Sequence, residues 1–294
     1  MPLTVSALHR YPVKSCGGTA LDEAVVEPWG LAGDRRWLVT DVDGGFVTAR
    51  ELPLLLTVGV ASADDGALTL TAAGRDPQPV AVPAPGDTGG TTRVGIWRDE
   101  VEAVAAPPGA SAWLSAVVGH DVRLLHLADP AQRPVSRQFA EDGDRVSFAD
   151  GYPLLVTTEA SLTALNHLVA DGRNDAEWPV DMGRFRPNLV VAGGEAWDED
   201  GWRRIRVGAG DDAATFRAVK GCARCVMTVH DPATGERGKE PLATLARHRR
   251  WDGQSWFGMN LVPDTPGATV RVGDQVEVLE RADAGDGPPR GGNA

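Results

Sequence analysis

The sequence predicts a mainly β protein with a few helices, an α+β fold. Short runs of apolar and β-branched residues recur along the chain, Gly, Pro and Asp separate them, and helical periodicity occurs in only three places. Short strands with turn residues between them are typical of β-barrels and sandwiches. The expected strands are Leu3 to Leu8, Trp37 to Thr40, Leu54 to Val60, Ala67 to Thr71, Val101 to Ala105, Arg123 to His126, Leu154 to Thr157, Leu189 to Val191, Thr215 to Val219, Val226 to Val229, Thr269 to Val272 and Val276 to Leu279.

Turn and cap residues locate the other elements. Asp43-Gly44 lies between two β-type runs and favours a hairpin, because such a turn needs residues that accept positive φ. The expected helices are one capped by Ser111 and closed by Gly119, one over Glu159 to Ala170 that Gly172 ends, and one with Pro241 in its first turn. We expect these few helices to cover sheets.

Size and composition divide the chain into two connected units and a tail. The 294 residues can bury a large core. Asp129-Pro130 and Arg133-Pro134 interrupt the strand pattern, so we expect one unit over residues 1–126 and a second over residues 127–280. The stretch from Ala73 to Thr91 is expected to be an exposed loop, and residues 281–294, which have almost nothing to bury, a disordered tail.

Charge and cysteine content exclude several classes of protein. The 29 Lys and Arg residues against 41 Asp and Glu residues give a net charge of −12, which repels phosphate backbones and anionic membranes. Three cysteines are too few for a disulfide framework, and the N-terminus lacks a secretion signal. Since no apolar stretch approaches the roughly 20 residues that span a bilayer, we expect a cytoplasmic protein that binds neither nucleic acid nor membranes.

Arg224-Cys225 is the most informative pair of residues in the chain. A neighbouring guanidinium favours the thiolate over the thiol, and the thiolate is the form that attacks electrophiles and binds metals. We therefore expect Cys225 to be the chemical centre of the protein.

Cys222 and Cys225 form a lone CxxC motif, which leaves other interpretations open. A dithiol redox site should end a strand and open a helix, whereas Val226 to Val229 is expected to continue as a strand. Structural zinc needs four ligands, and Cys16, His230 and His248 provide no second closely spaced pair. Two buried cysteines that act as small apolar residues are the third alternative.

Polar and basic residues gather in several Gly- and Pro-rich turns. Lys14 and Ser15 precede two glycines and suit contact with an anion. Arg35, Arg186 and Asn188 lie at strand edges, where arginine can bind phosphate and asparagine the edge of a heterocycle. Each of these turns alone is typical of an ordinary protein surface. The presence of several basic turns in an acidic chain, however, favours a binding site. Motifs of serine hydrolases, zinc proteases and nucleotide-binding folds are absent from the sequence.

The chain resembles the MOSC-domain proteins that carry an N-terminal MOSC β-barrel region, the group that includes the mitochondrial amidoxime-reducing component and bacterial proteins that protect against hydroxylaminopurines. The resemblance predicts a MOSC β-barrel with an intertwined N-terminal β-barrel region whose first strands complete the cofactor site. The matching stretches, in family order, are Tyr11-Pro-Val-Lys-Ser-Cys16, Asp34-Arg-Arg-Trp-Leu-Val39, Val47-Thr-Ala-Arg50, Asp150-Gly-Tyr-Pro-Leu-Leu155, Glu159-Ala-Ser-Leu162, Arg184-Phe-Arg-Pro-Asn188, Cys222-Ala-Arg-Cys225, Asp231-Pro-Ala-Thr-Gly235 and Lys239-Glu-Pro-Leu-Ala-Thr-Leu245.

The resemblance implies a molybdenum cofactor, molybdopterin, with Cys225 as the protein ligand of the molybdenum. A soft thiolate suits such a metal. Relatives have Thr and Ser where this chain has Gly151 and Tyr152, so only backbone contacts are carried over there. The residues expected to contact the cofactor are Lys14, Ser15, Arg35, Gly151, Tyr152, Arg186, Asn188, Ala223, Arg224 and Cys225.

The reaction that the resemblance implies is the two-electron reduction of N-hydroxylated compounds. Because the chain has no cysteine beyond Cys225 for an iron–sulfur domain, we expect electrons from another protein: a ferredoxin, a flavodoxin, or a cytochrome with its reductase. The alternative is a sulfur-carrier or cofactor-delivery protein that uses a Cys225 persulfide. Pyridoxal phosphate binding is a further property that the resemblance suggests.

Overall fold

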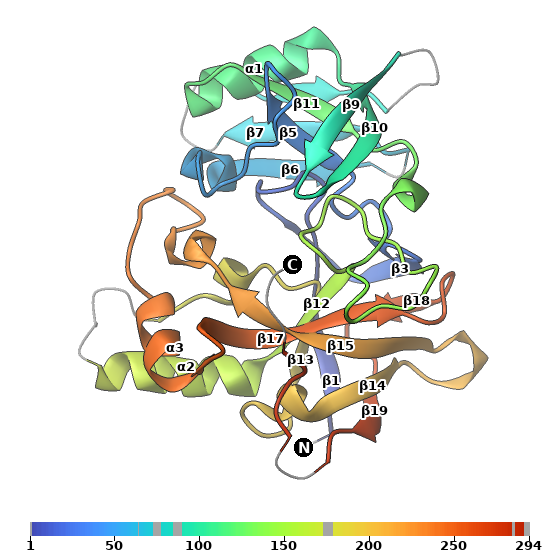
Figure 1. The fold of residues 1–294 in the computed structure, drawn as a ribbon, viewed down its shortest axis with the longest axis vertical. Helices are drawn as coiled ribbons and strands as arrows, with labels where there is room; N and C mark the ends of the chain where they lie inside the picture. The colour runs from blue at the N-terminus through green and yellow to red at the C-terminus, as the bar shows by residue number, and fades with distance from the viewer. Residues whose placement is uncertain are drawn as a thin grey trace.

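The computed structural model describes residues 2–63, 65–72, 78–84, 90–172, 179–283 and 286–290. The chain forms two β-rich bodies, one above the other in Figure 1. The upper body holds β5 to β11 and α1, and the lower body holds the remaining strands with α2 and α3. The prediction of a mainly β fold with a few helices is confirmed.

A nine-stranded sheet forms most of the lower body. The strands pair antiparallel except for β12 and β13, which run parallel. Along β15 the residues Ala214, Phe216 and Ala218 are buried and alternate with partly exposed ones, so one face of the sheet packs on a core. The order is β19 (Val276–Arg281), β14 (Trp202–Val207), β15 (Ala214–Arg224), β17 (Gln254–Pro263), β12 (Leu154–Thr158), β13 (Leu189–Ala192), β1 (Thr4–Arg10) and β2 (Thr19–Leu21), with β16 (Arg250–Trp251) paired to β17.

A small sheet closes over this core. Its residues Val26, Leu31 and Val270 share one apolar cluster with Phe216 and Trp202 of the large sheet. The small sheet consists of β18 (Thr269–Arg271), β3 (Glu23–Glu27) and β4 (Gly30–Leu31).

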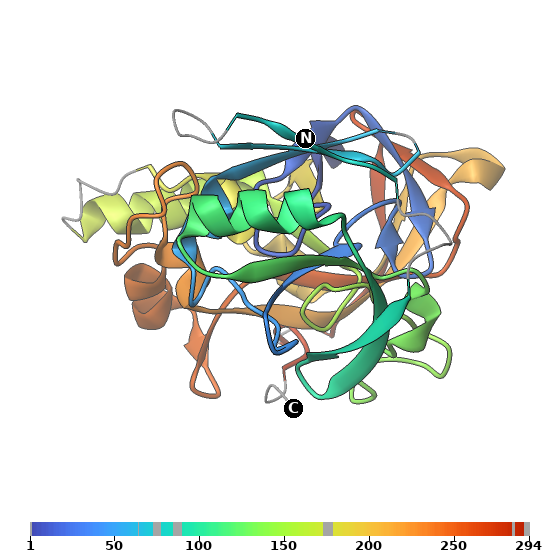
Figure 2. The same ribbon diagram turned by 90° about the horizontal axis from the view of Figure 1, so that it is seen from above.

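The upper body consists of two further sheets and one helix. Figure 2 shows α1 (Pro108–Val118) lying across the strands, and its Trp113 and Leu114 pack in the core of this body. One strand, β8, lies inside the expected loop from Ala73 to Thr91, whose residues 73–77 and 85–89 fall outside the described ones. The sheets are β5 (Trp37–Asp41), β11 (Val122–His126), β10 (Asp99–Ala105) and β9 (Thr91–Ile96), and β6 (Val58–Ser62), β7 (Leu68–Ala72) and β8 (Val80–Val82).

The two bodies are intertwined through the N-terminal strands. β1 pairs with β13, with Leu8 opposite Leu189, and β3 pairs with β18. The chain therefore passes from the lower body to the upper body after β4 and returns after β11. This crossing brings the turn that follows β1 to the boundary between the bodies.

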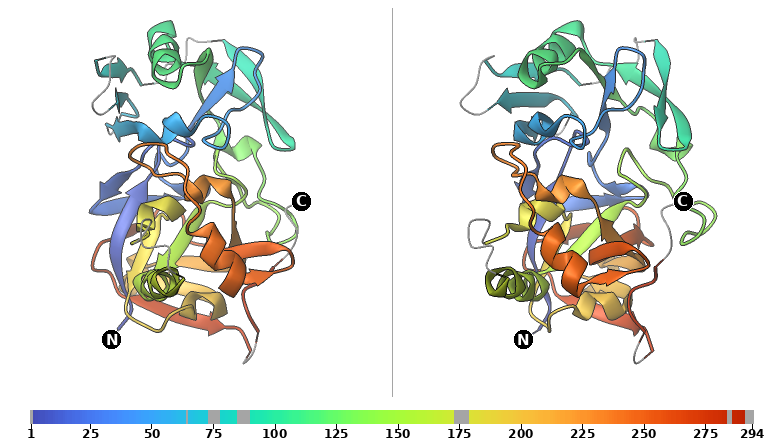
Figure 3. Two further views of the ribbon diagram at one scale, coloured as in Figure 1. Left: turned by 90° about the vertical axis from the view of Figure 1, so that its left-hand side faces the viewer. Right: turned by 60° about the vertical axis from the view of Figure 1, so that its left-hand side comes forward.

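α2 and α3 lie close to their predicted positions. The Thr158 hydroxyl accepts a hydrogen bond from the Ser161 amide, so α2 (Glu159–Asp171) begins there, and it ends before Gly172. α3 (Leu242–His248) follows Pro241. Figure 3 shows α2 and α3 on the same flank of the lower body, where Leu165 and Leu245 share a core. α1 begins earlier than expected, because the Ser111 hydroxyl accepts from the Leu124 amide instead of capping the helix.

Several local predictions were wrong. The expected strand from Leu54 to Val60 begins only at Val58, because Pro53–Thr57 forms a 3-10 helix. Val226–Val229 is a 3-10 helix, not a strand, because β15 leaves the sheet after Arg224 pairs with Ser255 and the chain then turns on its own hydrogen bonds. Part of the expected disordered tail contacts the large sheet: the Gly221 amide donates to the Pro289 carbonyl at 2.9 Å, and Pro288 is buried. The pairing of β15 with β17 shifts register beside Gly221, which frees that amide for the tail.

The predicted turn at Asp43-Gly44 is present, and only a single bridge from Thr40 to Phe46 extends it. The Asp41 carboxylate accepts from the amides of Asp43 and Gly45 and holds the turn. Across the described residues, no helix combines the length and apolarity that a bilayer crossing requires.

Candidate functional site

A pocket where loops of the two bodies meet brings together all the residues expected to contact the cofactor. Lys14 and Ser15 come from the turn after β1, and Cys225 from the end of β15, far away in the sequence. The predicted residues that line the pocket are Lys14, Ser15, Arg35, Gly151, Tyr152, Arg186, Asn188, Ala223, Arg224 and Cys225. Thr48, Arg50, Asp150, Cys222, Thr228 and Asn260 are among the further lining residues.

Three lining residues that are not glycine have left-handed backbone conformations. The φ angles are 72° at Ser15, 47° at Arg35 and 56° at Arg186. Each such conformation costs about 1–3 kcal/mol and persists only where the surrounding structure holds it, which is common at functional sites. The backbone of the pocket wall is therefore held in conformations that reduce stability. This strain indicates a functional site, and no sequence motif predicted it.

Arg35 and Arg186 stack on the ring of Tyr11. Their guanidinium carbons lie 4.4 and 4.2 Å from the ring centroid, close enough for cation–π attraction. Arg35 also donates to Asp34 at 2.6 Å and to the Asn188 side-chain oxygen at 3.0 Å. Two guanidinium groups of like charge are thus held side by side at the pocket wall.

The Asn188 side chain is engaged by protein groups. Its oxygen accepts from Arg35 and from the Leu155 amide, and its nitrogen donates to the His9 carbonyl at 3.2 Å. In this arrangement Asn188 positions Arg35, which is a more indirect role than the expected contact with a heterocycle.

Arg186 is a buried cation with spare hydrogen-bonding capacity. Its side-chain Nη2 has no hydrogen-bond partner among the described residues. Burial lowers the pKa of Arg186 to about 10, and the neighbouring Arg35 acts in the same direction. An unpaired buried donor is costly, so an anionic ligand at this position would stabilise it.

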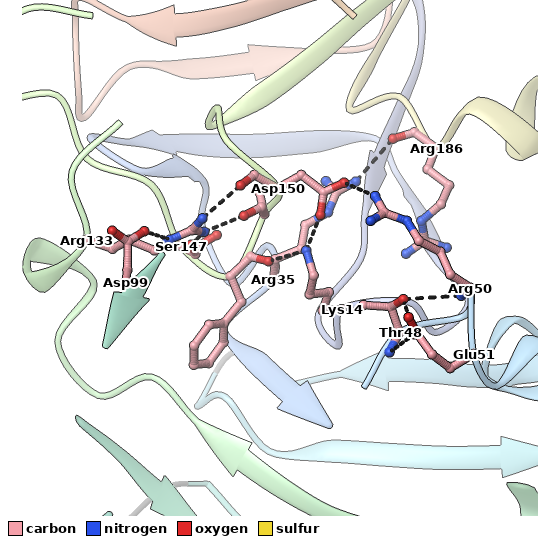
Figure 4. Close-up of polar contacts among 12 residues, drawn as sticks. Lys14, Arg35, Thr48, Arg50, Glu51, Asp99, Arg133, Ser147, Asp150 and Arg186 are labelled. Atoms are coloured by element: carbon pink, nitrogen blue, oxygen red, sulfur yellow. Dashed lines mark hydrogen bonds and ion pairs between the residues drawn. The ribbon is translucent and has the colours of Figure 1, made fainter. Parts of the chain in front are cut away.

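Asp150 links two further cations of the pocket, Lys14 and Arg50, as Figure 4 shows. The buried Lys14 ammonium donates to the Phe148 carbonyl at 2.9 Å and forms an ion pair with Asp150. Arg50 lies 3.5 Å from the other carboxylate oxygen. Burial lowers the pKa of Lys14 to about 8, although Asp150 opposes this change. Burial acts to raise the pKa of Asp150, but Lys14 and Arg50 outweigh it and hold that pKa well below its usual range.

Arg133 fixes the loop that carries Asp150. This buried residue does not line the pocket, yet its guanidinium donates to the carbonyls of Ser147 at 2.8 Å and Asp150 at 2.7 Å, and also to that of Ala149. Its Nε donates to Asp99 at 2.8 Å. Arg133 thereby ties the pocket loop to β10 of the upper body (Figure 4).

The Arg224 guanidinium, which was expected to act on Cys225, is directed toward Cys222, and Arg50 supplies a second guanidinium to the pocket wall that contains Cys225. Arg224 donates to the Cys222 sulfur at 2.8 Å and to the Phe185 carbonyl at 2.6 Å. Arg50 lines the same pocket and interacts electrostatically with Cys225. Burial acts to lower the pKa of Arg50, but Cys225 and Asp150 more than offset this and raise it. Adjacency in sequence does not determine these contacts, because neighbouring side chains along β15 point in different directions.

The geometry of the CxxC motif opposes an internal disulfide. Cys222 lies within extended β15, and Cys225 continues in extended conformation, with φ −112° and ψ 175°. Both cysteines are free, and three fully extended steps would hold their Cα atoms up to about 10 Å apart, beyond the roughly 7 Å that a disulfide can bridge. Within the described ranges, no three His, Cys, Asp or Glu side chains gather where they could hold a metal ion.

Gly151 and Tyr152 form an open part of the wall. A Cβ atom at Gly151 would meet nothing within 4 Å, and its φ lies outside the left-handed region. A larger residue therefore fits at this position. Burial raises the pKa of Tyr152 to about 12, so its phenol is a neutral group in the pocket.

Sequence reasoning omitted several residues that the pocket uses. Arg50 stands in the motif Val47-Thr-Ala-Arg50 and Asp150 directly precedes Gly151, so the family motifs contained both signals. No comparable signal marked Arg133, whose role follows from its contacts with carbonyl groups.

Fold and pocket together define a protein of two intertwined β bodies that enclose a basic, cysteine-containing site. Residues 2–121 match the MOSC N-terminal β-barrel domain and residues 143–277 match the MOSC domain. The chain is 33% identical to human mitochondrial amidoxime-reducing component 1, over 94% of this chain and 83% of the relative. It is 31% identical to human mitochondrial amidoxime reducing component 2, over 93% of this chain and 82% of the relative. The chain therefore belongs to the family of MOSC-domain proteins with an N-terminal MOSC β-barrel, alongside the amidoxime-reducing components.

More distant similarities extend to other proteins. The molybdenum cofactor sulfurase of rice, Oryza sativa subsp. japonica, is 29% identical over 85% of this chain, which spans 31% of that longer protein. The crystal structure of YuaD from Bacillus subtilis aligns over 94% of both chains with 11% identity and a TM-score of 0.42, a likeness too distant to inform the site.

Proposed function

We propose that this protein is a molybdenum-cofactor-dependent reductase of N-hydroxylated compounds such as amidoximes, hydroxylamines and hydroxylaminopurines. The observation that carries the proposal is the pocket, in which the Cys225 thiol is accompanied by cations from distant parts of the chain. The similarity to amidoxime-reducing components supports the reaction class. The cations are Lys14, Arg35, Arg50, Arg186 and Arg224.

The residues of the pocket fit a molybdenum cofactor. A cysteine sulfur is a soft ligand that suits molybdenum, and Cys225 is a free, partly exposed cysteine. The cofactor carries a phosphate, and both Arg186 Nη2 and Arg224 Nε are buried donors without a partner among the described residues. An anion in the pocket would satisfy such donors through charge-assisted hydrogen bonds.

Each part of the pocket has a role in this proposal. Cys225 would hold the metal, Arg186 and Lys14 would bind the anionic part of the cofactor, and Arg50 keeps a fixed positive charge beside the Cys225 sulfur. When bound, the cofactor supplies two-electron redox chemistry, and the protein supplies orientation and electrostatics. We leave pyridoxal phosphate out of the proposal, because a Schiff base needs the neutral amine of a lysine, whereas Lys14, the lysine among the lining residues, is paired as an ammonium with Asp150.

The proposed reaction breaks the N–O bond of the substrate. A hydroxylamine takes up two electrons and two protons and yields the amine and water. The electrons would come from an external electron-transfer protein, a ferredoxin, a flavodoxin, or a cytochrome with its reductase. We further propose a cytoplasmic location, which the three free cysteines support, since reducing compartments keep thiols free.

Turnover of benzamidoxime tests the proposal. Protein from a molybdenum-replete host should convert benzamidoxime to benzamidine with reduced flavodoxin or ferredoxin, or with chemically reduced methyl viologen. Protein from a host that cannot make the cofactor should be inactive. Equal activity of the two preparations would contradict a molybdenum-dependent reductase.

A second candidate function is sulfur transfer or delivery of the molybdenum cofactor. It is favoured by the similarity to molybdenum cofactor sulfurases of rice and tomato, Solanum lycopersicum. In that case the Cys225 thiolate would accept a sulfane sulfur from the persulfide of a donor protein, whose thiol leaves, and the resulting Cys225 persulfide would raise the intact mass of the purified protein by one sulfur atom. The added mass should be absent from Cys225→Ala, and substrate reduction should be absent from both proteins.

A further inference from the structure

Trp97 is an exposed aromatic residue in a strained position near the pocket. Trp97 lies at the turn between β9 and β10. The residue is 43% exposed, and its backbone is left-handed, with a φ of 55°. A bulky residue with such a φ is an outlier, and the conformation costs about 1–3 kcal/mol. Burial of the indole does not explain this cost, because nearly half of the residue faces solvent.

The contacts of the indole point toward the cations of the site. The Arg50 guanidinium carbon lies 4.7 Å from the ring centroid, and the Lys14 ammonium 5.9 Å. The ring of Phe46 lies 5.0 Å away at 60° and supports the indole from the turn after β5. Trp97 therefore covers the two cations that pair with Asp150.

Arg50 is held from several sides. Its backbone amide donates to the Thr48 hydroxyl, which in turn donates to the Glu51 carboxylate at 2.6 Å, so the turn beneath it is fixed (Figure 4). The guanidinium then meets Asp150 at 3.5 Å, in the pocket whose wall also holds Cys225, and it interacts electrostatically with that cysteine. These partners come from segments far apart in the chain.

We propose that Trp97 is a positioning residue that holds the Arg50 guanidinium against the Cys225 sulfur. A free arginine side chain on a partly exposed surface samples many rotamers, and its ion pair with Asp150 is long, at 3.5 Å. Cation–π contact with the indole removes that freedom at a cost in backbone strain. The upper body thus contributes one charge to the site and one aromatic side chain that directs the charge. The inference rests on the proposed function only for the importance of Cys225.

Charge-selective alkylation of Cys225 tests this role in the full-length, cofactor-free protein. Anionic iodoacetate and neutral iodoacetamide both react with the thiolate. The rate constant for iodoacetate divided by that for iodoacetamide is therefore independent of the thiolate fraction, and it rises with positive charge near the sulfur. The modified Cys225 peptide is quantified by mass spectrometry, which separates it from Cys222 and Cys16. We expect Arg50→Met to lower the ratio about fivefold, as a lost unit charge a few ångströms away predicts.

Trp97→Ala should lower the ratio about threefold, because cation–π contacts at partly exposed sites are worth roughly that factor. Trp97→Phe, which keeps an aromatic face, should stay close to wild type. Trp29→Ala is the matched control, since Trp29 lies 5.9 Å from Arg36 outside the pocket, and its ratio should not change. Circular dichroism verifies that each variant is folded.

Three outcomes would overturn the inference. If Arg50→Met lowers the ratio and Trp97→Ala does not, Trp97 does not position Arg50. If Arg50→Met leaves the ratio unchanged, Arg50 does not act on Cys225. If Trp29→Ala lowers the ratio as much as Trp97→Ala does, the effect is a general loosening of the protein. Because no turnover is measured, a protein without reductase activity can still pass or fail this test.

Discussion

Asp150 is central to the charge arrangement of the pocket, because its carboxylate pairs with both Lys14 and Arg50. Its side chain is 58% exposed, while that of its partner Lys14 is 7% exposed. A buried ammonium that loses its counter-ion retains its desolvation cost, but solvent at the open carboxylate end weakens the pair. The exposure of Asp150 therefore limits what the ion pair contributes to stability, even though it holds both Lys14 and Arg50.

Asp150→Asn should destabilise the protein by about 1–2 kcal/mol, because Lys14 keeps the Phe148 carbonyl but loses its charge partner. Urea unfolding at pH 7 measures the difference. Glu23→Gln is a suitable control, since Glu23 pairs with Arg271 on the surface, and it should change stability by less than about 1 kcal/mol. Equal losses in both variants would contradict the role assigned to Asp150.

Residue chemistry in the sequence was enough to find the cysteine and most of the cations, but not their pairing. Cys225, Arg35 and Arg186 line the pocket as expected. The contacts of Arg224 with Cys222 and the Phe185 carbonyl were not predicted, because side-chain direction depends on the twist and bulges of β15, whose register shifts between Gly221 and Ala223. The roles of these residues toward a cofactor remain predictions.

At the scale of elements, the loop from Ser147 to Asp150 has no regular structure and depends on Arg133. A loop outside helices and sheets needs other hydrogen-bond donors for its buried carbonyl groups. Here the planar Arg133 guanidinium donates to three of them. Lysine presents a single ammonium and cannot reproduce this fork.

Arg133→Met should destabilise the protein by about 3 kcal/mol, because buried carbonyls at Ser147 and Ala149 lose their donor. Arg133→Lys should recover less than half of that loss. Thermal and urea unfolding provide the measurement. Arg36→Met offers a comparison, since Arg36 donates to Leu127 and Ala128 on a more exposed surface. A neutral effect of Arg133→Met would show that the loop does not need this residue.

Helices were more predictable than strands, for a local reason. The Thr158 cap and Gly172 define α2 within a few neighbouring residues. β17 (Gln254–Pro263) was missed, because Gly258 and Asn260 interrupt its apolar pattern and its identity depends on pairing with β12 and β15. Val226–Val229 was misread, because a short apolar run does not distinguish a strand from a buried turn.

At the scale of the whole molecule, the exchange of N-terminal strands makes the pocket a product of both bodies. Pairing of β1 with β13 and of β3 with β18 joins segments that are far apart in the chain. Such long-range pairing has no signal in a single sequence, so only the resemblance to a family predicted intertwined bodies. Since the strands are shared, separation of the chain at residue 126 would divide the large sheet.

The stability of the whole protein should also depend on one acid in the lower body. Glu199 is fully buried, accepts hydrogen bonds from Ser161 at 2.7 Å and Thr158 at 3.0 Å, and burial raises its pKa to about 7. Because the folded state binds this proton more tightly than the unfolded state does, stability should fall as pH rises from 5 to 8, by up to about 3 kcal/mol from this group.

Glu199→Gln removes the titration and keeps a similar shape. The difference in unfolding free energy between wild type and Glu199→Gln, measured in urea at pH 5, 6, 7 and 8, should shift in favour of the variant as pH rises. Other titrating groups cancel in this difference. A pH-independent difference would contradict the assignment of a proton to buried Glu199.

The molybdenum content of the purified protein tests the central proposal most directly. Protein from a molybdenum-replete host should contain molybdenum by elemental mass spectrometry, and Cys225→Ser should lower the bound amount by at least about tenfold, because the ligand sulfur is lost. Cys222→Ser should retain most of the metal. If Cys225→Ser binds as much molybdenum as wild type, or if wild type binds none and still reduces benzamidoxime, then Cys225 does not anchor a molybdenum cofactor in this pocket.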